Sequence, residues 1–390
     1  MNNFTYWSPT EFVFGRNTIS KTAHLLKKYN GTNVLIHYGE QFAVKSGLLN
    51  DIETLLQHHF IHYVKLGGVQ PNPMDTLVYE GIELCRKENV NFILAVGGGS
   101  VIDSAKAIAS GVYYASDFRN FFEGNVTINR ALPVGTILTI PAAGSEGSDR
   151  MVITQKDGLL KRGTKSPFLR PVFSILDPVL SFSLPAYQTA SGIADMMGHI
   201  MERYFSRTQG VEVSDRMCEG LLKAIIKESP TVLNEPENYD ARANIMWAGM
   251  LAHNDICGVG REEDWATHKL EHELSALYGV THGAGLAVMF PAWMKYVYTS
   301  GIDKFVQFAV RVWDIKETDN KNETALKGIE SLKNFFSMLG LPVSLAELNI
   351  PNPDINTLIE KLAMNTGGRT GAFRQLDMED AEAIYRIAAK

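Results

Sequence analysis

The sequence predicts two domains, an N-terminal α/β domain with a mostly parallel sheet over residues 1–182 and an all-helical C-terminal domain over residues 183–390. In the first domain, short apolar stretches rich in β-branched residues alternate with stretches of helical period, which is the pattern of βαβ units. From about residue 185 onward the β-branched clusters stop and the helical period continues to the end. A parallel sheet binds its ligands beyond the carboxyl ends of its strands.

Individual segments support each domain in turn. The expected strands begin with an alternating edge strand, TEFVFG, and continue as NVLIHYG (33–39), HYVKLGGV (62–69), NFILAVGGG (91–99), PVGTILTIPAAGSEGS (133–148) and PVFSILDP (171–178). Helical stretches such as MDTLVYEGIELCRKENV lie between them. The second domain shows helical period in MCEGLLKAIIKESPTVL, IDKFVQFAVRVW, ETALKGIESLKNFFSMLG and MEDAEAIYRIAA.

The composition is that of a globular protein and excludes several kinds of partner. Hydrophobic residues make up 45% of the chain and charged residues 21%, and the net charge of −6 argues against nucleic acid, whose binding needs a basic face. No apolar run is long enough to span a membrane, and the N-terminus MNNFTYWSPTEF lacks the regions of a signal peptide. The three cysteines share no CxxC spacing, which fits a reducing compartment. We therefore expect a cytoplasmic protein.

A glycine run follows the strand in FILAVGGGSVIDSAKAIASG, residues 92–111. Neither common phosphate fingerprint matches, because Ile102 stands where a dinucleotide motif has its third glycine and no Gly-Lys-Ser/Thr is present. Glycines 97–99 would still let backbone N–H groups approach a ligand closely, and the following helix offers its positive end to an anion. The alternative interpretation is a tight strand-to-helix turn that binds nothing.

Three polar residues in the same stretch favour a phosphate site. Ser100 could cap the helix or donate its hydroxyl to a phosphate. Asp103 and Lys106 stand at i and i+3, so they share one helix face. A carboxylate one turn into the helix would lie near the ligand and could accept a hydrogen bond from a ribose or an amide.

Four side chains in the second domain form a candidate metal site. In SGIADMMGHIMERYF, Asp195 and His199 stand at i and i+4 and share one helical face. In EEDWATHKLEHELSALYGVTHGAGLAV, His268 is followed by His282, which precedes a glycine. One carboxylate and three imidazoles suit Zn²⁺ or Fe²⁺ rather than Mg²⁺ or Ca²⁺. An isolated pair would more simply be a surface polar pair, but two such segments in one domain favour a metal. The histidines expected to be structural or solvated are His24, His37, His58, His59, His62 and His253.

These motifs resemble those of the iron-containing alcohol dehydrogenases, which have the dehydroquinate synthase-like fold. GGGSVIDSAK is similar to that family's GGGSxxDxxK element, DMMGH to its Asp-x-x-x-His pair, and HKLEHELSALYGVTHGAGLAV to its His-x-x-x-His…His-Gly element. The resemblance covers nearly the whole chain and is closest to the NADPH-dependent butanol dehydrogenase branch, through segments such as GVQPNP and DWATHKLEHELSA. It implies a metal-dependent alcohol dehydrogenase or aldehyde reductase that transfers a hydride between NAD(P)(H) and a primary alcohol or aldehyde.

The resemblance also implies roles for individual residues. The α/β domain would bind the dinucleotide. Its pyrophosphate would contact Gly98, Gly99 and Ser100, and its nicotinamide end would lie beside Asp103. Asn72 and Thr139 would line the cofactor cleft, and Lys161 would contact the nicotinamide ribose. The helical domain would hold the metal and the substrate, with the ligands Asp195, His199, His268 and His282. Fe²⁺ is the implied working metal, and Zn²⁺ can replace it in purified protein because it outcompetes Fe²⁺ at most nitrogen and oxygen sites.

His272 matches the family's extra histidine near the substrate. We expect it, together with Asp103, to take part in catalysis, because an imidazole that titrates near neutral pH can relay the alcohol proton. The alternative role for His272 is a hydrogen bond beside the metal ligands.

The sequence departs from the branch at YGEQF, where the branch has YGGGS, and at Ala143, where it has a small hydroxyl residue. Gly39 and Glu40 follow the second strand, and an acidic residue there hydrogen-bonds the adenosine ribose and repels a 2′-phosphate. We therefore expect weaker discrimination for NADPH, or a preference for NADH. The alternative is that Glu40 points into solvent and decides nothing.

Three rival functions remain open at this stage. A glycerol-type polyol dehydrogenase would hold zinc with fewer protein ligands than the four candidates here. A lyase of the dehydroquinate synthase type would need a basic cluster, and residues 255–290 offer few basic side chains. A nucleotide-binding sensor without turnover would not need the complete ligand set. In related proteins the N-terminal edge strand helps to form a dimer, so we also expect a homodimer.

Overall fold

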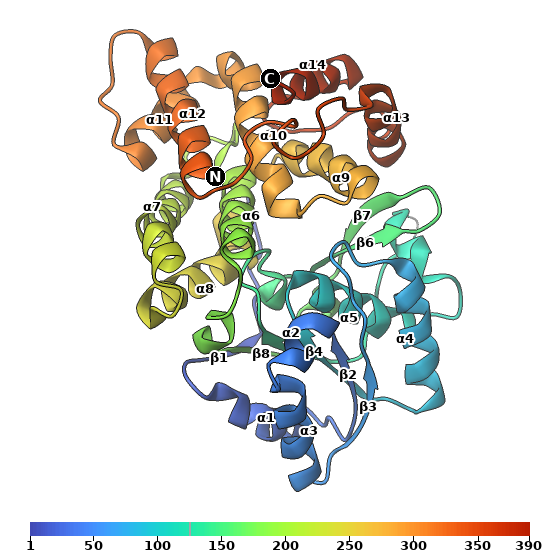
Figure 1. The fold of residues 1–390 in the computed structure, drawn as a ribbon. Helices are drawn as coiled ribbons and strands as arrows, with labels where there is room; N and C mark the ends of the chain where they lie inside the picture. Colours follow the sequence, from blue (N-terminus) through green and yellow to red (C-terminus); the bar gives the residue numbers. More distant parts are fainter. Residues whose placement is uncertain (125) are drawn as a thin grey trace. The chain divides into compact units, whose positions relative to one another are not determined.

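The computed structural model describes residues 1–124 and 126–390, except for the side chains of residues 40–42. It divides the chain into an α/β unit, Trp7–Ser183, and a helical unit, which comprises Met1–Tyr6 and Leu184–Lys390 (Figure 1). The first six residues join the helical unit through backbone bonds such as Asn2 N–H to Gly260 O, at 2.8 Å. Among the described residues, no helix has both the length and the hydropathy that crossing a bilayer requires.

The α/β unit contains a six-stranded parallel sheet, as the sequence predicted. Its strand order is β1-β8-β5-β4-β2-β3. The strands are β1 (Glu11–Phe14), β2 (Asn33–Tyr38), β3 (His62–Leu66), β4 (Phe92–Gly97), β5 (Val134–Leu138) and β8 (Phe173–Leu176). The helices are α1 (Thr22–Lys28), α2 (Glu40–Lys45), α3 (Leu48–His58), α4 (Asp75–Lys87) and α5 (Gly99–Gly111). A two-stranded antiparallel sheet, β6 (Arg150–Gln155) with β7 (Leu160–Lys165), was not anticipated from the sequence.

The strand order places a topological switch point between β2 and β4. From β2 the chain continues to β3 on one side, whereas from β4 it continues to β5 on the other side. Tyr38 is in register with Val96, so Gly39 and Gly97 follow neighbouring strand ends. Ligands of open parallel sheets bind at such a point, outside the carboxyl ends of the strands. The glycine run therefore lies where this topology favours a ligand.

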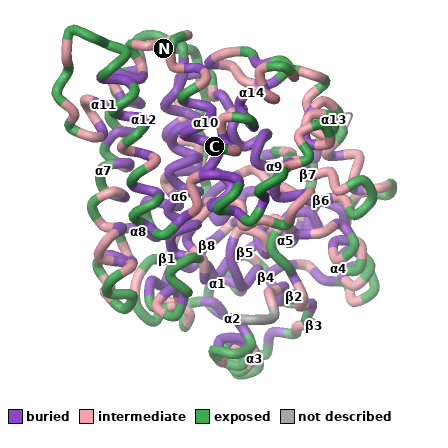
Figure 2. Tube along the Cα trace, turned by 45° about the horizontal axis from the view of Figure 1, so that its top comes forward, coloured by how far each residue is buried: buried purple, intermediate pink, exposed green. Residues whose placement is uncertain are grey.

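The helical unit is built from nine α-helices within the described part of the chain. They are α6 (Ala186–Tyr204), α7 (Glu212–Asn234), α8 (Tyr239–His253), α9 (Ala266–Tyr278), α10 (His282–Val297), α11 (Ile302–Trp313), α12 (Lys321–Met338), α13 (Ile355–Thr366) and α14 (Met378–Ala388). Most of α6 and α10 is buried (Figure 2). Both helices are apolar around much of their circumference, which is typical of helices at the centre of a core.

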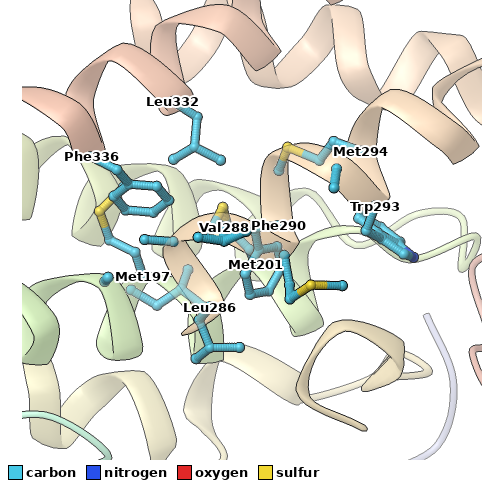
Figure 3. Packing of buried hydrophobic residues seen from close by; sticks show 14 of the residues in the cluster. Met197, Met201, Leu286, Val288, Phe290, Trp293, Met294, Leu332 and Phe336 are labelled. Carbon is cyan, nitrogen blue, oxygen red and sulfur yellow. The ribbon is translucent and has the colours of Figure 1, made fainter. Parts of the chain in front are cut away.

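The packing of α6 against α10 sets the spacing of this core. Met197 and Met201 of α6 contribute to the same apolar cluster as Leu286 and Phe290 of α10 (Figure 3). Gly198 of α6 makes room for α10, because a Cβ there would lie 3.0 Å from the Phe290 ring. The helices therefore approach closely at the level of the candidate metal ligands.

His37 was expected to be structural or solvated. Its buried, hydrogen-bonded ring has a structural role. The side chain is fully buried in β2, with Nδ1 2.9 Å from the Leu66 carbonyl oxygen and Nε2 2.9 Å from the Ser104 hydroxyl. A neutral ring satisfies both bonds, since Nδ1–H donates and Nε2 accepts. Burial lowers the pKa of His37 to about 4.

The lowered pKa of His37 predicts that acid destabilises the folded protein. In the unfolded state the pKa of a histidine is about 6.5. As the pH falls from that value toward the folded-state pKa, the unfolded state therefore binds more protons than the folded state. His37 should therefore remove about 2 kcal/mol of stability between pH 7 and pH 5. Urea titrations should show a smaller pH-dependent loss in His37→Gln than in wild type, and an unchanged loss in the control His59→Gln, whose side chain is exposed. Equal losses in wild type and His37→Gln would contradict the assignment.

Candidate functional site

The four predicted metal ligands come from three helices of the helical unit. Asp195 and His199 lie on successive turns of α6, His268 lies in the first turn of α9, and His282 is the first residue of α10. Asp195, His199 and His268 are buried, and His282 is half-buried. The structure thus brings together side chains that are 87 positions apart at the extremes, Asp195 and His282.

The distances among these side chains fit one ion. His199 Nε2 lies 3.3 Å and His282 Nε2 lies 3.8 Å from Asp195 Oδ1. Ligand atoms of Asp195, His268 and His282 all lie within 4.8 Å of one another, and the rings of His199 and His268 stack with centroids 4.6 Å apart. Tetrahedral ligands about 2.1 Å from an ion are about 3.4 Å from each other. The donor set therefore fits a divalent ion such as Fe²⁺ or Zn²⁺.

The ionisation state of His199 suits a ligand role. Burial, followed by the neighbouring imidazoles, holds the pKa of His199 well below its usual range. A neutral imidazole is the form that binds a metal.

Two buried glutamates beside the site were missed by the sequence analysis. Glu202 Oε1 accepts hydrogen bonds from the backbone N–H of His268, at 2.9 Å, and from its Nδ1, at 2.8 Å. Glu271 Oε2 accepts a bond from His282 Nδ1. A local signal for them existed, because Glu202 stands three residues after His199 and Glu271 three after His268, so each shares a helix face with a ligand.

His253, expected to be structural or solvated, is buried beside the candidate ligands. Its ring lies 4.0 Å, centroid to centroid, from that of His199, and its Nδ1 is 3.1 Å from the fully buried guanidinium of Arg203. Arg203 also donates to the His199 carbonyl at 2.8 Å and lies over the Trp265 ring. This arrangement supports the α6 turn that carries His199.

His272 lies close to the ligands without being one of the four. Its ring centroid is 6.4 Å from that of His268 and 5.5 Å from that of His282, and the side chain is half-buried. His272 therefore lies beside the candidate ligands, where the sequence predicted a residue near the substrate. Its role in proton transfer stays a prediction.

In the α/β unit, the glycine loop begins α5 at the switch point. Gly98 is the N-cap residue, and within the described chain no side chain caps this helix, so Ser100 lies in its first turn and is not the cap. The first turn also contains no acidic residue. The first N–H groups of α5 have no partner within the helix and carry its positive end, which is the geometry for an anion.

The glycines of this loop are needed for space rather than for backbone conformation. Gly98 has φ −91° and ψ −168°, which any residue can adopt. A Cβ at Gly98 would lie 3.0 Å from Ile140, and one at Gly99 would lie 3.2 Å from the Ala143 Cβ. A Cβ at Gly39 would instead meet only ordinary contacts, at 3.5 Å and 3.6 Å. Side chains at 98 or 99 would therefore disturb the protein itself.

Asp103 and Lys106 connect α5 to the segment that leads into β6. Asp103 accepts hydrogen bonds from the Ser145 hydroxyl at 2.5 Å and from the Val152 N–H at 2.9 Å. Lys106 is fully buried, and its Nζ donates to the carbonyl oxygens of Ser145, Ser148 and Arg150. Burial lowers the pKa of Lys106 to about 8. Contact of Asp103 with the nicotinamide end stays a prediction, and these bonds assign it a structural function as well.

The remaining predicted cofactor residues lie around the same end of the sheet. Lys161 Nζ donates to Asn72 Oδ1 at 2.9 Å, and the Thr139 N–H donates to the Gly97 carbonyl at 3.1 Å. Asn72 has φ +57°, a left-handed conformation that asparagine tolerates better than most residues. The Glu40 side chain lies outside the described residues.

The histidine–carboxylate cluster and the glycine loop at the switch point together indicate a metal-dependent nicotinamide dehydrogenase. Family models described as iron-containing alcohol dehydrogenase and as the C-terminal part of that family match residues 9–178 and 189–389. The chain therefore belongs to the iron-containing alcohol dehydrogenase family, and its activity is that of an NAD(P)-dependent alcohol dehydrogenase or aldehyde reductase.

Similar proteins agree over the full length. The chain is 40% identical over 389 residues to the probable NADH-dependent butanol dehydrogenase 1 of Bacillus subtilis, with 100% of both sequences covered. It is 35% identical over 391 residues to the NADPH-dependent aldehyde reductase YqhD of Escherichia coli, again with 100% of both covered. The crystal structure of NADH-dependent butanol dehydrogenase A from Thermotoga maritima matches with a TM-score of 0.97 and 40% identity, covering 100% of this chain and 99% of that one.

The ligand assignment predicts the metal content of variants. His282→Ala should lower the bound metal to less than about a tenth of the wild-type amount, because even residues behind the ligands change affinity by that factor. The control is His24→Ala, which replaces an exposed histidine of α1. Elemental analysis of the purified proteins is the measurement. Wild-type occupancy in His282→Ala would refute the assignment.

The close approach of a dinucleotide to Gly39 can be tested without disturbing the protein. Gly39→Ala should weaken NADH binding roughly tenfold, because the added methyl group fits the protein but occupies the space that the ligand needs. Gly220→Ala is the control, since a Cβ at Gly220 in α7 meets nothing within 4 Å. Fluorescence titration with NADH measures the effect. Unchanged affinity in Gly39→Ala would mean that the ligand does not pass this strand end.

Proposed function

We propose that the chain interconverts primary alcohols and aldehydes of about the size of butanol, with Fe²⁺ held by Asp195, His199, His268 and His282. The observation that supports this most strongly is the convergence of one carboxylate and three imidazoles in the helical unit. The relatives described as butanol dehydrogenases and as an aldehyde reductase support the substrate class. The lyase alternative loses its support, because both family models describe alcohol dehydrogenases.

When bound, the metal would supply Lewis acidity to the oxygen of the alcohol or aldehyde. The protein residues have separate tasks. The three imidazoles and Asp195 hold the ion, and the first turn of α5 binds the cofactor pyrophosphate through its backbone N–H groups. Asp103 and Lys106 hold the segment that follows β5 in place against α5. His272, half-buried beside the ligands, accepts the proton of the alcohol and passes it to water.

We further propose that the protein acts in the cytoplasm as a homodimer. β1 lies at the edge of the parallel sheet, and the side chain of Trp7 just before it is 55% exposed. An exposed edge strand preceded by an apolar side chain is suited to pairing with a second copy.

One assay tests the enzymatic proposal. Metal-stripped protein is reloaded anaerobically with Fe²⁺ and mixed with butanal and NADH or NADPH, and the absorbance of the reduced nicotinamide is followed. We expect turnover that depends on the metal and on butanal. Turnover with glycerol and NAD⁺ but none with butanal would favour the polyol dehydrogenase alternative, and coenzyme binding without any turnover would favour a sensor.

The coenzyme preference has its own test. The matched butanol dehydrogenases with 38–40% identity are described as NADH-dependent, which supports the expectation based on Glu40. Glu40→Gly should shift the ratio of kcat/KM for the two coenzymes toward NADPH, because it removes a negative charge near the expected 2′-phosphate. A wild-type preference for NADPH of a hundredfold, about 2.7 kcal/mol, would contradict this role of Glu40.

A further inference from the structure

Glu202 and Glu271 each accept a hydrogen bond from one nitrogen of a candidate ligand. The Glu202 carboxylate is 1% exposed, and its Oε1 receives both the backbone N–H and the Nδ1 of His268. The Glu271 carboxylate is fully buried, and its two oxygens receive His282 Nδ1 and the hydroxyl of Ser275. Both carboxylates are thus fixed by more than one bond.

The surrounding backbone is shaped around Glu271. Gly285 lies one turn into α10, and a Cβ at this position would lie 2.6 Å from Glu271 Oε1. Any larger residue would displace the carboxylate from His282. Gly285 is therefore explained by the space that this carboxylate occupies.

We propose that Glu202 and Glu271 are positioning residues that fix the Nδ1–H tautomers of His268 and His282, and that these hydrogen bonds set the affinity of the site for its metal. With Nδ1 committed to a carboxylate, only Nε2 of each ring remains for the ion, and His282 Nε2 indeed faces Asp195 Oδ1. A carboxylate behind an imidazole also raises its basicity as a ligand. This inference rests on the proposed metal site.

The third imidazole is supported in a different way. For His199 Nδ1, no hydrogen-bond partner is found among the described residues. Its ring is held by the tilted ring of His253, 4.0 Å away between centroids, and by its place on α6. The two glutamates therefore act on two of the three imidazoles, and both of those are on helices other than α6.

Glu273 provides a matched control on α9. Its carboxylate is 1% exposed, like that of Glu202, and it accepts a hydrogen bond from Asn365 Nδ2 at 2.7 Å. Its replacement by glutamine removes a buried carboxylate from the same helix as Glu271 and leaves the bonds of Glu202 and Glu271 to the histidines in place. General effects of neutralising a buried carboxylate can thus be separated from effects on the ligands.

The first test measures metal affinity in the full-length protein. Metal-free Glu202→Gln, Glu271→Gln, Glu273→Gln and wild type are titrated with Zn²⁺ against a competing chelator, with circular dichroism as the check on folding. We expect Zn²⁺ to bind 10- to 100-fold more weakly in Glu202→Gln and Glu271→Gln, and with unchanged affinity in Glu273→Gln. Equal affinities in all four proteins would overturn the inference.

A ligand variant separates this inference from the proposed site. If His282→Ala loses Zn²⁺ binding while Glu271→Gln retains the wild-type affinity, the metal site stands and the positioning role is wrong. If His282→Ala itself retains wild-type affinity, the metal site is wrong. Equal losses in Glu271→Gln and Glu273→Gln would show a general charge effect and would also overturn the positioning role.

The second test needs no glutamate variant, so it remains decisive if those variants fail to fold. In the zinc-loaded wild-type protein labelled with ¹⁵N-histidine, the ring protons of His268 and His282 should be attached to Nδ1, as judged from one-bond couplings. Correlations from each ring to the backbone of its own residue assign the two signals. A ring proton on Nε2 of either residue would overturn the inference.

Discussion

The candidate metal site depends on one steric constraint, the close approach of α10 to α6. Gly283, the second residue of α10, contacts the backbone of α6 at Ser191, and a Cβ there would overlap the Ser191 carbonyl oxygen. Ser191 is one turn before Asp195, so this contact fixes His282 beside the carboxylate. Gly198 performs a similar function one turn later, where Phe290 and Leu286 pack onto α6. Without these glycines the ligand atoms of α6 and α10 could not lie about 4 Å apart.

In the α/β unit, two charged side chains of α5 fix this helix to the segment that leads into β6. Lys106 is fully buried, yet its ammonium group is surrounded by carbonyl and hydroxyl oxygens of residues 145–150, and Asp103 binds the same segment. Such a network is stable only when its polar groups are satisfied, because an unpaired buried charge is costly. The same helix presents its N-terminal N–H groups at the glycine loop. A helix whose N-terminus is suited to an anion is thus fixed to its neighbours one to two turns further on.

Local patterns explain why much of both units could be predicted. The parallel sheet followed from alternating apolar stretches, and the proximity of Asp195 and His199 followed from a four-residue spacing on one helix. The antiparallel pair β6 and β7 was missed, because β7 carries three charged residues in six and lacks an apolar stretch like those of the parallel strands. Glu202 and Glu271 were missed as well, since glutamates on helices are common and their burial depends on neighbours distant in the sequence.

The sequence by itself identified the residue types on which the expected chemistry depends: one carboxylate and three imidazoles suited to a metal, and a glycine run before a helix suited to an anion. These depend on residue identity and on spacing within one element, which the sequence records directly. Only the tertiary structure decided which nitrogen of His268 and His282 is held by a carboxylate, and that the glycine loop leaves no space for side chains beside Ile140 and Ala143. The reason is physical. Tautomers and clearances are set by atoms from other helices and strands, whose positions follow from the packing of the whole unit.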